Sequence, residues 1–244
     1  MRDSLHVRLY ADSLGLPRNN YVSSDQRYIN LLCDWLSEKF SKKIRLVDNS
    51  KSNSLIHSLY HQFLEDETYF EPADILIIHE GVCDCAPRPI PQKIRRLISK
   101  FPSFIRKRMV MFIHNNRSFL QRNGMRFYLT NEKKYENIYS LWLEKLSKTK
   151  TIVFLFEIAP TNDSIEMQSP GFRESIKKYN LLLENAVNKI NGPNIHLIKI
   201  NSLICKQNNI NNYIIEEDGH HITSKAHTLF FNSIKEVLDL EETI

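Results

Sequence analysis

Short runs of apolar residues recur along the chain, and within them Ile, Val, Leu and Phe follow one another almost without interruption. Such runs are typical of strands that are buried on both faces of a parallel sheet. We therefore expect strands at 6–11 (HVRLYA), 43–48 (KIRLVD), 73–79 (ADILIIH), 151–158 (TIVFLFEI) and 194–200 (NIHLIKI). A further run at 108–115 (RMVMFIHN) could form a sixth strand.

Between these runs, apolar residues recur at the spacing of amphipathic helices. Helices are predicted at 26–40, 54–65, 135–146, 171–190 and 225–240. Strands that alternate with helices predict an α/β fold with three α/β/α layers, flavodoxin-like, around a mostly parallel five-stranded sheet. The length favours a single domain over 1–244, and the segment at about 109–150 is long enough to hold a lid or an insertion.

Composition narrows the class of protein only modestly. With 42% hydrophobic and 25% charged residues, the chain has the make-up of an ordinary globular protein. The N-terminus lacks an apolar signal segment, and no apolar run approaches membrane-spanning length, so a cytoplasmic location is expected. The four cysteines (33, 83, 85 and 205) show no disulfide framework. Cys83 and Cys85 lie near His79, but a second pair of zinc ligands is missing, so neither a metal nor another cofactor is predicted.

Positive charge is concentrated in one stretch. The formal net charge is +5, and 92–109 holds Lys93, Arg95, Arg96, Lys100, Arg106, Lys107 and Arg108. A solvated helix face is the simpler interpretation. The alternative is attraction to an anionic partner, such as an acidic polysaccharide, a lipid-linked sugar phosphate or an anionic membrane surface. Nucleic acid is not expected, because no recognition motif accompanies the charge.

The end of the first predicted strand raises a chemical question, because Asp12 and Ser13 come just before a turn at Gly15 and Pro17. Both residue types suit turns and helix caps. A serine at the carboxyl edge of a sheet can also be a nucleophile, provided that a base and an orienting acid lie nearby. Asp218 and His221, three residues apart before the last predicted helix, could supply them, with His220 as the less suitable neighbour.

At this point three motifs together resemble the GDSL or SGNH hydrolase family. They are YADSLGLPR after the first strand, DILIIHEGVCDCAPRPIP around the third strand, and DGHHIT before the last helix. The middle motif is similar to a bacterial subgroup that has D-C-A-P-R after the glycine. The resemblance implies the SGNH fold, with Ser13 as the nucleophile and first oxyanion donor, His221 as the base and Asp218 as its orienting acid.

The chain departs from the family pattern at the oxyanion site. The region that corresponds to the family's second block, 48–54, has no glycine, so a backbone N–H of Ser52 or Asn53 would have to serve beside Gly81. Cys83 stands where the family has an asparagine donor, and a thiol donates weakly. Arg88, Asn115 or Asn116 could replace it.

Several polar residues are candidates for contacting substrate. Arg88 is stiffened by prolines on both sides, and Arg18 follows Pro17. Asp84 follows Cys83 and would contact substrate or hold its loop. Asn116, with Arg117 beside it, would line the pocket if 108–115 were a strand.

The sequence thus predicts a serine esterase or acylhydrolase that needs no cofactor. The subgroup resemblance suggests acyl esters of carbohydrates as substrates, in surface-polysaccharide biosynthesis. Two alternatives stay open: an O-acyltransferase acting on surface-polysaccharide sugars, and a catalytically weak saccharide-binding accessory protein. The oligomeric state is not predicted.

Overall fold

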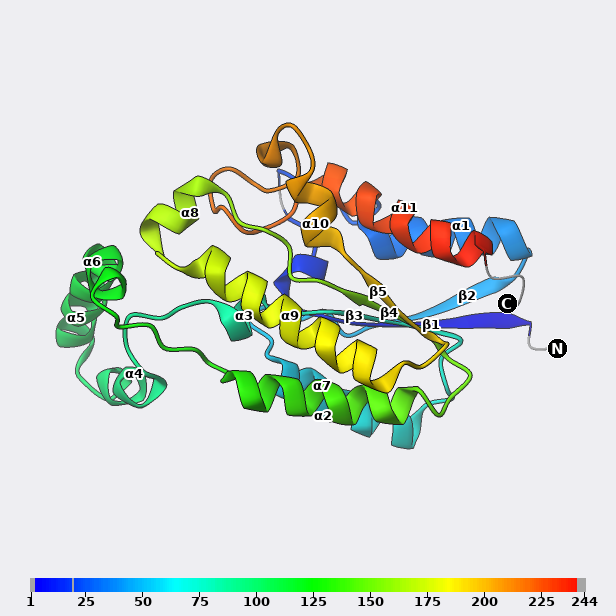
Figure 1. Cartoon of the computed structure of the whole chain (residues 1–244), viewed down its shortest axis with the longest axis horizontal. Helices are drawn as coiled ribbons and strands as arrows, with labels where there is room; N and C mark the ends of the chain where they lie inside the picture. Colours follow the sequence, from blue (N-terminus) through cyan, green and yellow to red (C-terminus); the bar gives the residue numbers. More distant parts are fainter. Residues whose placement is uncertain (1–2, 19, 241–244) are drawn as a thin grey trace.

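A computed structural model describes residues 3–18 and 20–240, and its centre is a five-stranded sheet in the order β2-β1-β3-β4-β5 (Figure 1). Every neighbouring pair of strands is parallel. The strands are β1 (Ser4–Ala11), β2 (Lys43–Asp48), β3 (Ile75–His79), β4 (Ile152–Phe156) and β5 (Ile195–Ile198). The prediction of an α/β fold with a parallel sheet is therefore confirmed.

Helices cover both faces of the sheet and give the predicted three layers. On one face, α1 (Tyr28–Phe40) packs against α11 (Ser224–Leu240); on the other, α7 (Glu132–Leu146) packs against both α2 (Ile56–Tyr69) and α9 (Phe172–Ile190) (Figure 1). Each of these five helices buries one apolar stripe, as the helical spacing of the sequence requires.

The predicted sixth strand is wrong. Residues 108–115 belong to α5 (Ser103–Asn115), which follows Pro102 and has no buried residue. Its run of apolar residues therefore lies at the surface rather than in the sheet: Met111 and Phe112 are both more than half exposed. Together with α4 (Gln92–Ser99) and α6 (Arg117–Arg122), α5 forms a group of three helices at one end of the molecule (Figure 1). Whether the segment at 109–150 acts as a lid stays a prediction.

The shorter elements lie in the connections. They are two 3-10 turns, η1 (Ser13–Gly15) and η2 (Ile210–Asn212), and three short helices, α3 (Val82–Cys85), α8 (Asp163–Gln168) and α10 (Ile200–Cys205). Because parallel strands share one carboxyl edge, η1 after β1 and α3 after β3 begin side by side. Among residues 3–18 and 20–240, no helix is both long and apolar enough to span a bilayer.

Candidate active site

Ser13 is held at the sheet edge by the residue before it. The backbone N–H of Asp12 donates to the carbonyl of His79 at 3.0 Å, which ties the end of β1 to β3. The Asp12 carboxylate then caps η1 by accepting from the N–H of Leu14 at 2.8 Å. A Cβ at Gly15 would lie only 2.5 Å from that of Ala11, so this sharp turn requires glycine. Ser13 thus starts a fixed turn, and its side chain faces a pocket.

The turn that carries His221 is organised around the carboxylate of Asp218. One of its oxygens accepts from the N–H groups of His220 (3.1 Å) and His221 (2.9 Å), and the other lies 2.8 Å from Nδ1 of the His221 ring. Burial alone would raise the pKa of Asp218, but these hydrogen bonds outweigh it and hold the pKa well below its usual range. Asp218 is therefore an anion at neutral pH.

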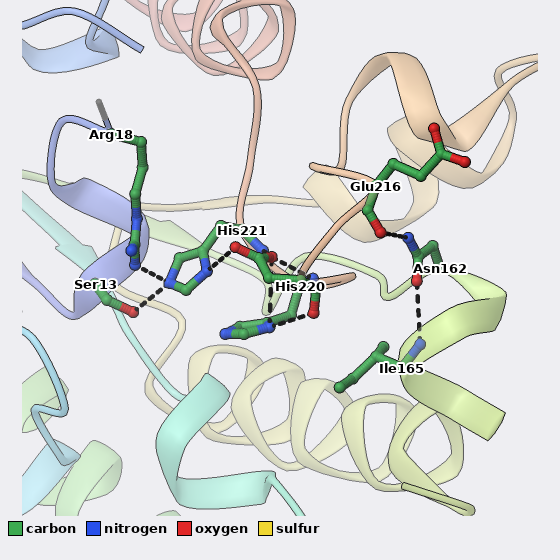
Figure 2. A network of polar contacts seen from close by, with 8 residues as sticks. Ser13, Arg18, Asn162, Ile165, Glu216, His220 and His221 are labelled. Carbon is green, nitrogen blue, oxygen red and sulfur yellow. Dashed lines mark hydrogen bonds and ion pairs between the residues drawn. The ribbon is translucent and has the colours of Figure 1, made fainter. Parts of the chain in front are cut away.

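The ionised carboxylate also settles which ring nitrogen of His221 carries the proton. A carboxylate can only accept, so Nδ1 donates to Asp218 and Nε2 is left with its lone pair. Nε2 lies 3.0 Å from Oγ of Ser13 (Figure 2). This serine hydroxyl can therefore donate to a histidine that is itself oriented by an acid, which is the arrangement of a nucleophilic triad.

A second contact anchors this turn to the body of the molecule. Gly219 adopts φ +74°, and its carbonyl accepts from the N–H of Asn162 at 3.0 Å. The Asn162 side chain donates to the carbonyl of Glu216 and accepts from the N–H of Ile165 (Figure 2). The start of α8 therefore fixes the position of the histidine turn.

His220 does not contact Ser13. Its Nδ1 lies 2.9 Å from the carbonyl of Asp218, and burial followed by the nearby His221 lowers its pKa. Asp218, His220 and His221 are close enough together to be considered as metal ligands. However, both Asp218 oxygens already accept hydrogen bonds, which makes the cluster a poor cation site.

The pocket in front of Ser13 and His221 has a volume of about 290 Å³. Ser52 and Asn53, from the loop after β2, lie on its wall, and Asn53 adopts φ 56°. In the described part of the chain, their backbone N–H groups donate to no other group. Gly81 does not line the pocket; a Cβ there would lie 2.8 Å from Ile158 and Tyr135, in the core.

Cys83 lines the pocket, as its place in the middle motif predicts. Burial raises the pKa of its thiol to about 12, so the group is neutral at physiological pH. A neutral thiol is a weak hydrogen-bond donor, and a buried one of this kind is not a nucleophile.

Three arginines surround the same pocket. Arg18 contacts Nε2 of His221 directly (Figure 2). Arg88 is held by a pair of backbone hydrogen bonds with Phe127, at 2.7 and 2.9 Å. Arg117, at the start of α6, donates to Oγ of Ser169 at 2.7 Å. The predicted candidates Arg18 and Arg88 thus reach the pocket, and Arg117 joins them.

Two predicted substrate contacts do not reach the pocket. Asp84 is fully buried, and its carboxylate accepts from the N–H of Ile56 at 3.1 Å and from the hydroxyl of Thr130. It holds its loop in place. Asn116 directly follows α5, and its side chain donates to the carbonyl of Phe112 at 2.8 Å, because 108–115 is a helix and not a strand.

Two apolar wall residues were missed by sequence reasoning. Ile165 of α8 and Phe172 of α9 both line the pocket. They belong to no motif, and only the packing of these helices against the sheet brings them there. No signal in the sequence could have identified them.

A cluster of buried acids lies behind the site. Burial raises the pKa of Asp12 to about 7. Burial, and then the charge of Asp84, raises the pKa of Glu80 well above its usual range, and Glu80 accepts from the hydroxyl of Tyr139 at 2.8 Å. These groups therefore carry protons at or near neutral pH, and they support the loops after β1 and β3.

Comparisons with known proteins agree with this geometry at the level of the fold. No model of a known protein family matches the chain, and no curated protein matches it. Solved structures do. A lipase/acylhydrolase from Enterococcus faecalis superimposes with a TM-score of 0.65 at 10% identity, over 96% of this chain and 95% of that one.

Two further solved structures match nearly the whole chain at similarly low sequence identity. An acetylxylan esterase from Geobacillus stearothermophilus gives a TM-score of 0.62 at 11% identity, over 97% of this chain and 95% of the other. A member of the lipolytic G-D-S-L family from Veillonella parvula gives 0.57 at 12% identity, over 96% and 98%. The chain therefore has the α/β/α fold of the GDSL/SGNH hydrolases, and the sequence resemblance is confirmed at that level.

Proposed function

We propose that the protein is a serine esterase that forms an acyl-enzyme on Ser13. The observation that carries this proposal is the continuous chain of contacts from Ser13 through His221 to Asp218, at 3.0 and 2.8 Å. The fold supports it, because the matched structures include lipases and esterases. A serine, a histidine and an acid in this arrangement are suited to nucleophilic acyl transfer.

The proposed reaction begins when Oγ of Ser13 attacks the ester carbonyl. Its proton passes to Nε2 of His221, and the Asp218 carboxylate stabilises the imidazolium that results. When the tetrahedral intermediate collapses, the bond to the alcohol oxygen breaks and His221 returns the proton to that oxygen. Water then attacks the acyl-enzyme with His221 as base, which releases the acid and restores Ser13.

The negative oxygen of the intermediate needs hydrogen-bond donors. We assign this role to the backbone N–H of Ser13 and to the N–H groups of the Ser52–Asn53 loop, which faces Ser13 across the pocket. The weak donor Cys83 at the third position predicts a slower enzyme than one with an amide side chain there.

For the substrate we propose an acyl ester of a carbohydrate. The pocket wall carries serine, asparagine and arginine side chains beside apolar ones, and one of the matched structures is an acetylxylan esterase. If a sugar hydroxyl replaced water in the second step, the same residues would catalyse O-acyl transfer. A saccharide-binding protein with weak catalysis is favoured by the missing glycine and asparagine donors and by the basic segment 92–109.

Turnover of p-nitrophenyl acetate tests the proposal. We expect Ser13→Ala and His221→Ala to abolish it, and Asp218→Asn to lower kcat by about 10⁴-fold, since the wrong histidine tautomer would then be held. His61→Ala, at an exposed position of α2, is the control and retains activity. Equal loss in all four variants, or turnover that survives Ser13→Ala, would contradict the assignment.

A further inference from the structure

A second cavity adjoins the active-site pocket. Its volume is about 330 Å³, and it lies between α4, α5 and the segment 88–90. Arg88 and Arg117 line both cavities, so the two adjoin at these side chains. Arg95 of α4 and Arg106 of α5 line the far part, where they are exposed at the rim. Four guanidinium groups thus surround one hollow.

No carboxylate offsets this charge. In the described chain neither cavity is lined by an Asp or Glu, and Arg88 and Arg117 form no ion pair. The sequence from residue 85 to 131 contains no acidic residue at all. It does contain Arg88, Lys93, Arg95, Arg96, Lys100, Arg106, Lys107, Arg108, Arg117, Arg122 and Arg126.

Uncharged groups are the partners that the arginines do have. Arg117 donates to Oγ of Ser169 and to the carbonyl of Pro87, and Arg106 donates to the carbonyl of Ser99 at 3.4 Å. Burial, and then the nearby Arg95, lowers the pKa of Arg88; burial, and then Arg88, lowers that of Arg117. The arginines therefore repel one another, and an anion between them would relieve that repulsion.

We propose that this cavity binds a phosphate or diphosphate group of the acylated substrate whose ester lies at Ser13. This inference rests on the proposed function, because it takes the anion and the ester to belong to one molecule. A cluster of four guanidinium groups suits a multiply charged anion better than a single carboxylate, since each planar fork can donate two hydrogen bonds to phosphate oxygens. The substrate class is then an acylated sugar phosphate.

Arg88 and Arg117 are the residues that join the two halves of this site. Each is part-buried, so its side chain is held between the ester pocket and the arginine cavity. A sugar ring that spans the two would place its acyl group at Ser13 and its phosphate among Arg88, Arg95, Arg106 and Arg117. Neutral esters would occupy the first pocket only.

Anion binding can be measured without any catalysis, by calorimetric titration of the intact protein with inorganic pyrophosphate. We expect the double variant Arg95→Gln/Arg106→Gln to weaken binding by at least about tenfold, since it removes two charged donors. The matched control Arg96→Gln/Arg108→Gln removes the same charge from the same two helices at positions that do not line the cavity. It should change affinity by less than about twofold.

Kinetics then connect the cavity to the ester. The ratio of kcat/KM for an acetylated hexose 1-phosphate to that for the matching acetylated methyl hexoside should fall at least about tenfold in Arg95→Gln/Arg106→Gln and persist in the control. If the protein proves to have no esterase activity, the titration still decides whether the anion site exists. No pyrophosphate binding, or equal weakening in both double variants, would overturn the proposal.

The source of the phosphate is resolved by a third arm. Sedimentation with phosphatidylcholine vesicles, with and without phosphatidic acid, tests for a lipid-borne phosphate, which the exposed Phe104, Met111, Phe112 and Phe119 of α5 and α6 would favour. Binding that requires phosphatidic acid and is lost in Arg95→Gln/Arg106→Gln supports a lipid-linked substrate. Pyrophosphate binding without vesicle binding supports a soluble sugar phosphate.

Discussion

Ser13 and His221 are 208 positions apart in the chain, yet their side chains meet at hydrogen-bond distance. Each is fixed by a local device: Asp12 caps the turn that carries the serine, and Asp218 binds both the backbone and the ring of the histidine. Because the devices are local, short motifs could point to them, and the structure brings together the three residues that the sequence proposed.

Cys83 is the single residue that most limits the proposed reaction. Its thiol lines the pocket at the position of an expected amide donor. We predict that Cys83→Asn raises kcat for p-nitrophenyl acetate by about 10²-fold, because a strong donor to the oxyanion is typically worth that much. Cys83→Ala, which adds no donor, is the control and should leave kcat within about threefold. An unchanged rate in Cys83→Asn would mean that another group already fills this position.

Residue-level prediction failed where it depended on the wrong element. Asn116 was placed in the pocket because 108–115 was interpreted as a strand, and in the helix its amide instead donates to Phe112. Arg117, the next residue, does reach the pocket. The strand interpretation assumed that the apolar side chains of this run are buried, but on α5 they are exposed.

At the scale of elements, the histidine turn depends on a glycine. Gly219 has φ +74°, and a Cβ there would lie 2.5 Å from Oδ1 of Asn162 and 2.7 Å from Cβ of Ile165. Gly124 also has a positive φ, of +85°, but has no atom within 4 Å of such a Cβ. Alanine substitutions at the two positions therefore distinguish the effect of backbone strain from that of steric conflict.

We predict that Gly219→Ala lowers both stability and kcat, whereas Gly124→Ala lowers stability alone. Both variants incur about 1–2 kcal/mol from the left-handed backbone. Only Gly219→Ala should displace the turn that carries Asp218 and His221, and so lower kcat by at least about tenfold. Urea unfolding and steady-state kinetics measure the two effects. Equal kcat in the two variants would show that the turn tolerates the extra carbon.

The packing of α11 on the sheet has a pH-dependent component. His79 of β3 and His227 of α11 are buried among aromatic rings, and burial lowers the pKa of each to about 3. Above pH 6.5 both histidines are neutral in the folded and the unfolded protein, and the folded state has its full stability. As the pH falls from 6.5 toward 3, the unfolded state binds protons that the folded state does not, so stability is lost.

We therefore predict that protonation of the two histidines lowers the free energy of unfolding by about 2 kcal/mol each between pH 7.5 and pH 5. The raised pKa of Asp12 has the opposite effect over the same range and is common to all variants. In His227→Gln, whose side-chain oxygen can still accept from the N–H of Tyr28, one histidine's share of this loss, about 2 kcal/mol, should disappear. His61→Gln, at an exposed position, is the control and should keep the full pH dependence. Urea titrations at the two pH values provide the comparison, and an identical loss in His227→Gln would refute this assignment.

For the whole molecule, the parallel sheet and the three layers were predictable because buried parallel strands leave a strong apolar pattern. The arrangement of 92–122 was not, because three short, largely exposed helices leave no such pattern. The basic charge of this segment was visible in the sequence. Part of this charge lines a cavity beside Ser13, an arrangement that depends on tertiary packing and that only the structure shows.

This distribution of charge makes the reaction sensitive to salt. We predict that kcat/KM for an acetylated hexose 1-phosphate falls about fivefold between about 20 and 300 mM NaCl, because ions screen attraction to the arginines. The uncharged methyl hexoside ester, measured in parallel, should change by less than about 1.5-fold. Similar salt dependence for both esters would show that the arginines do not attract the substrate.

Intact-mass labelling with a fluorophosphonate tests whether Ser13 is an activated nucleophile. We expect one adduct per chain, located on Ser13, absent in Ser13→Ala and strongly slowed in His221→Ala, with the exposed-site variant His61→Ala labelled like the unmodified protein. No adduct under conditions that label an ordinary serine esterase, or an adduct that persists in Ser13→Ala, would contradict this expectation.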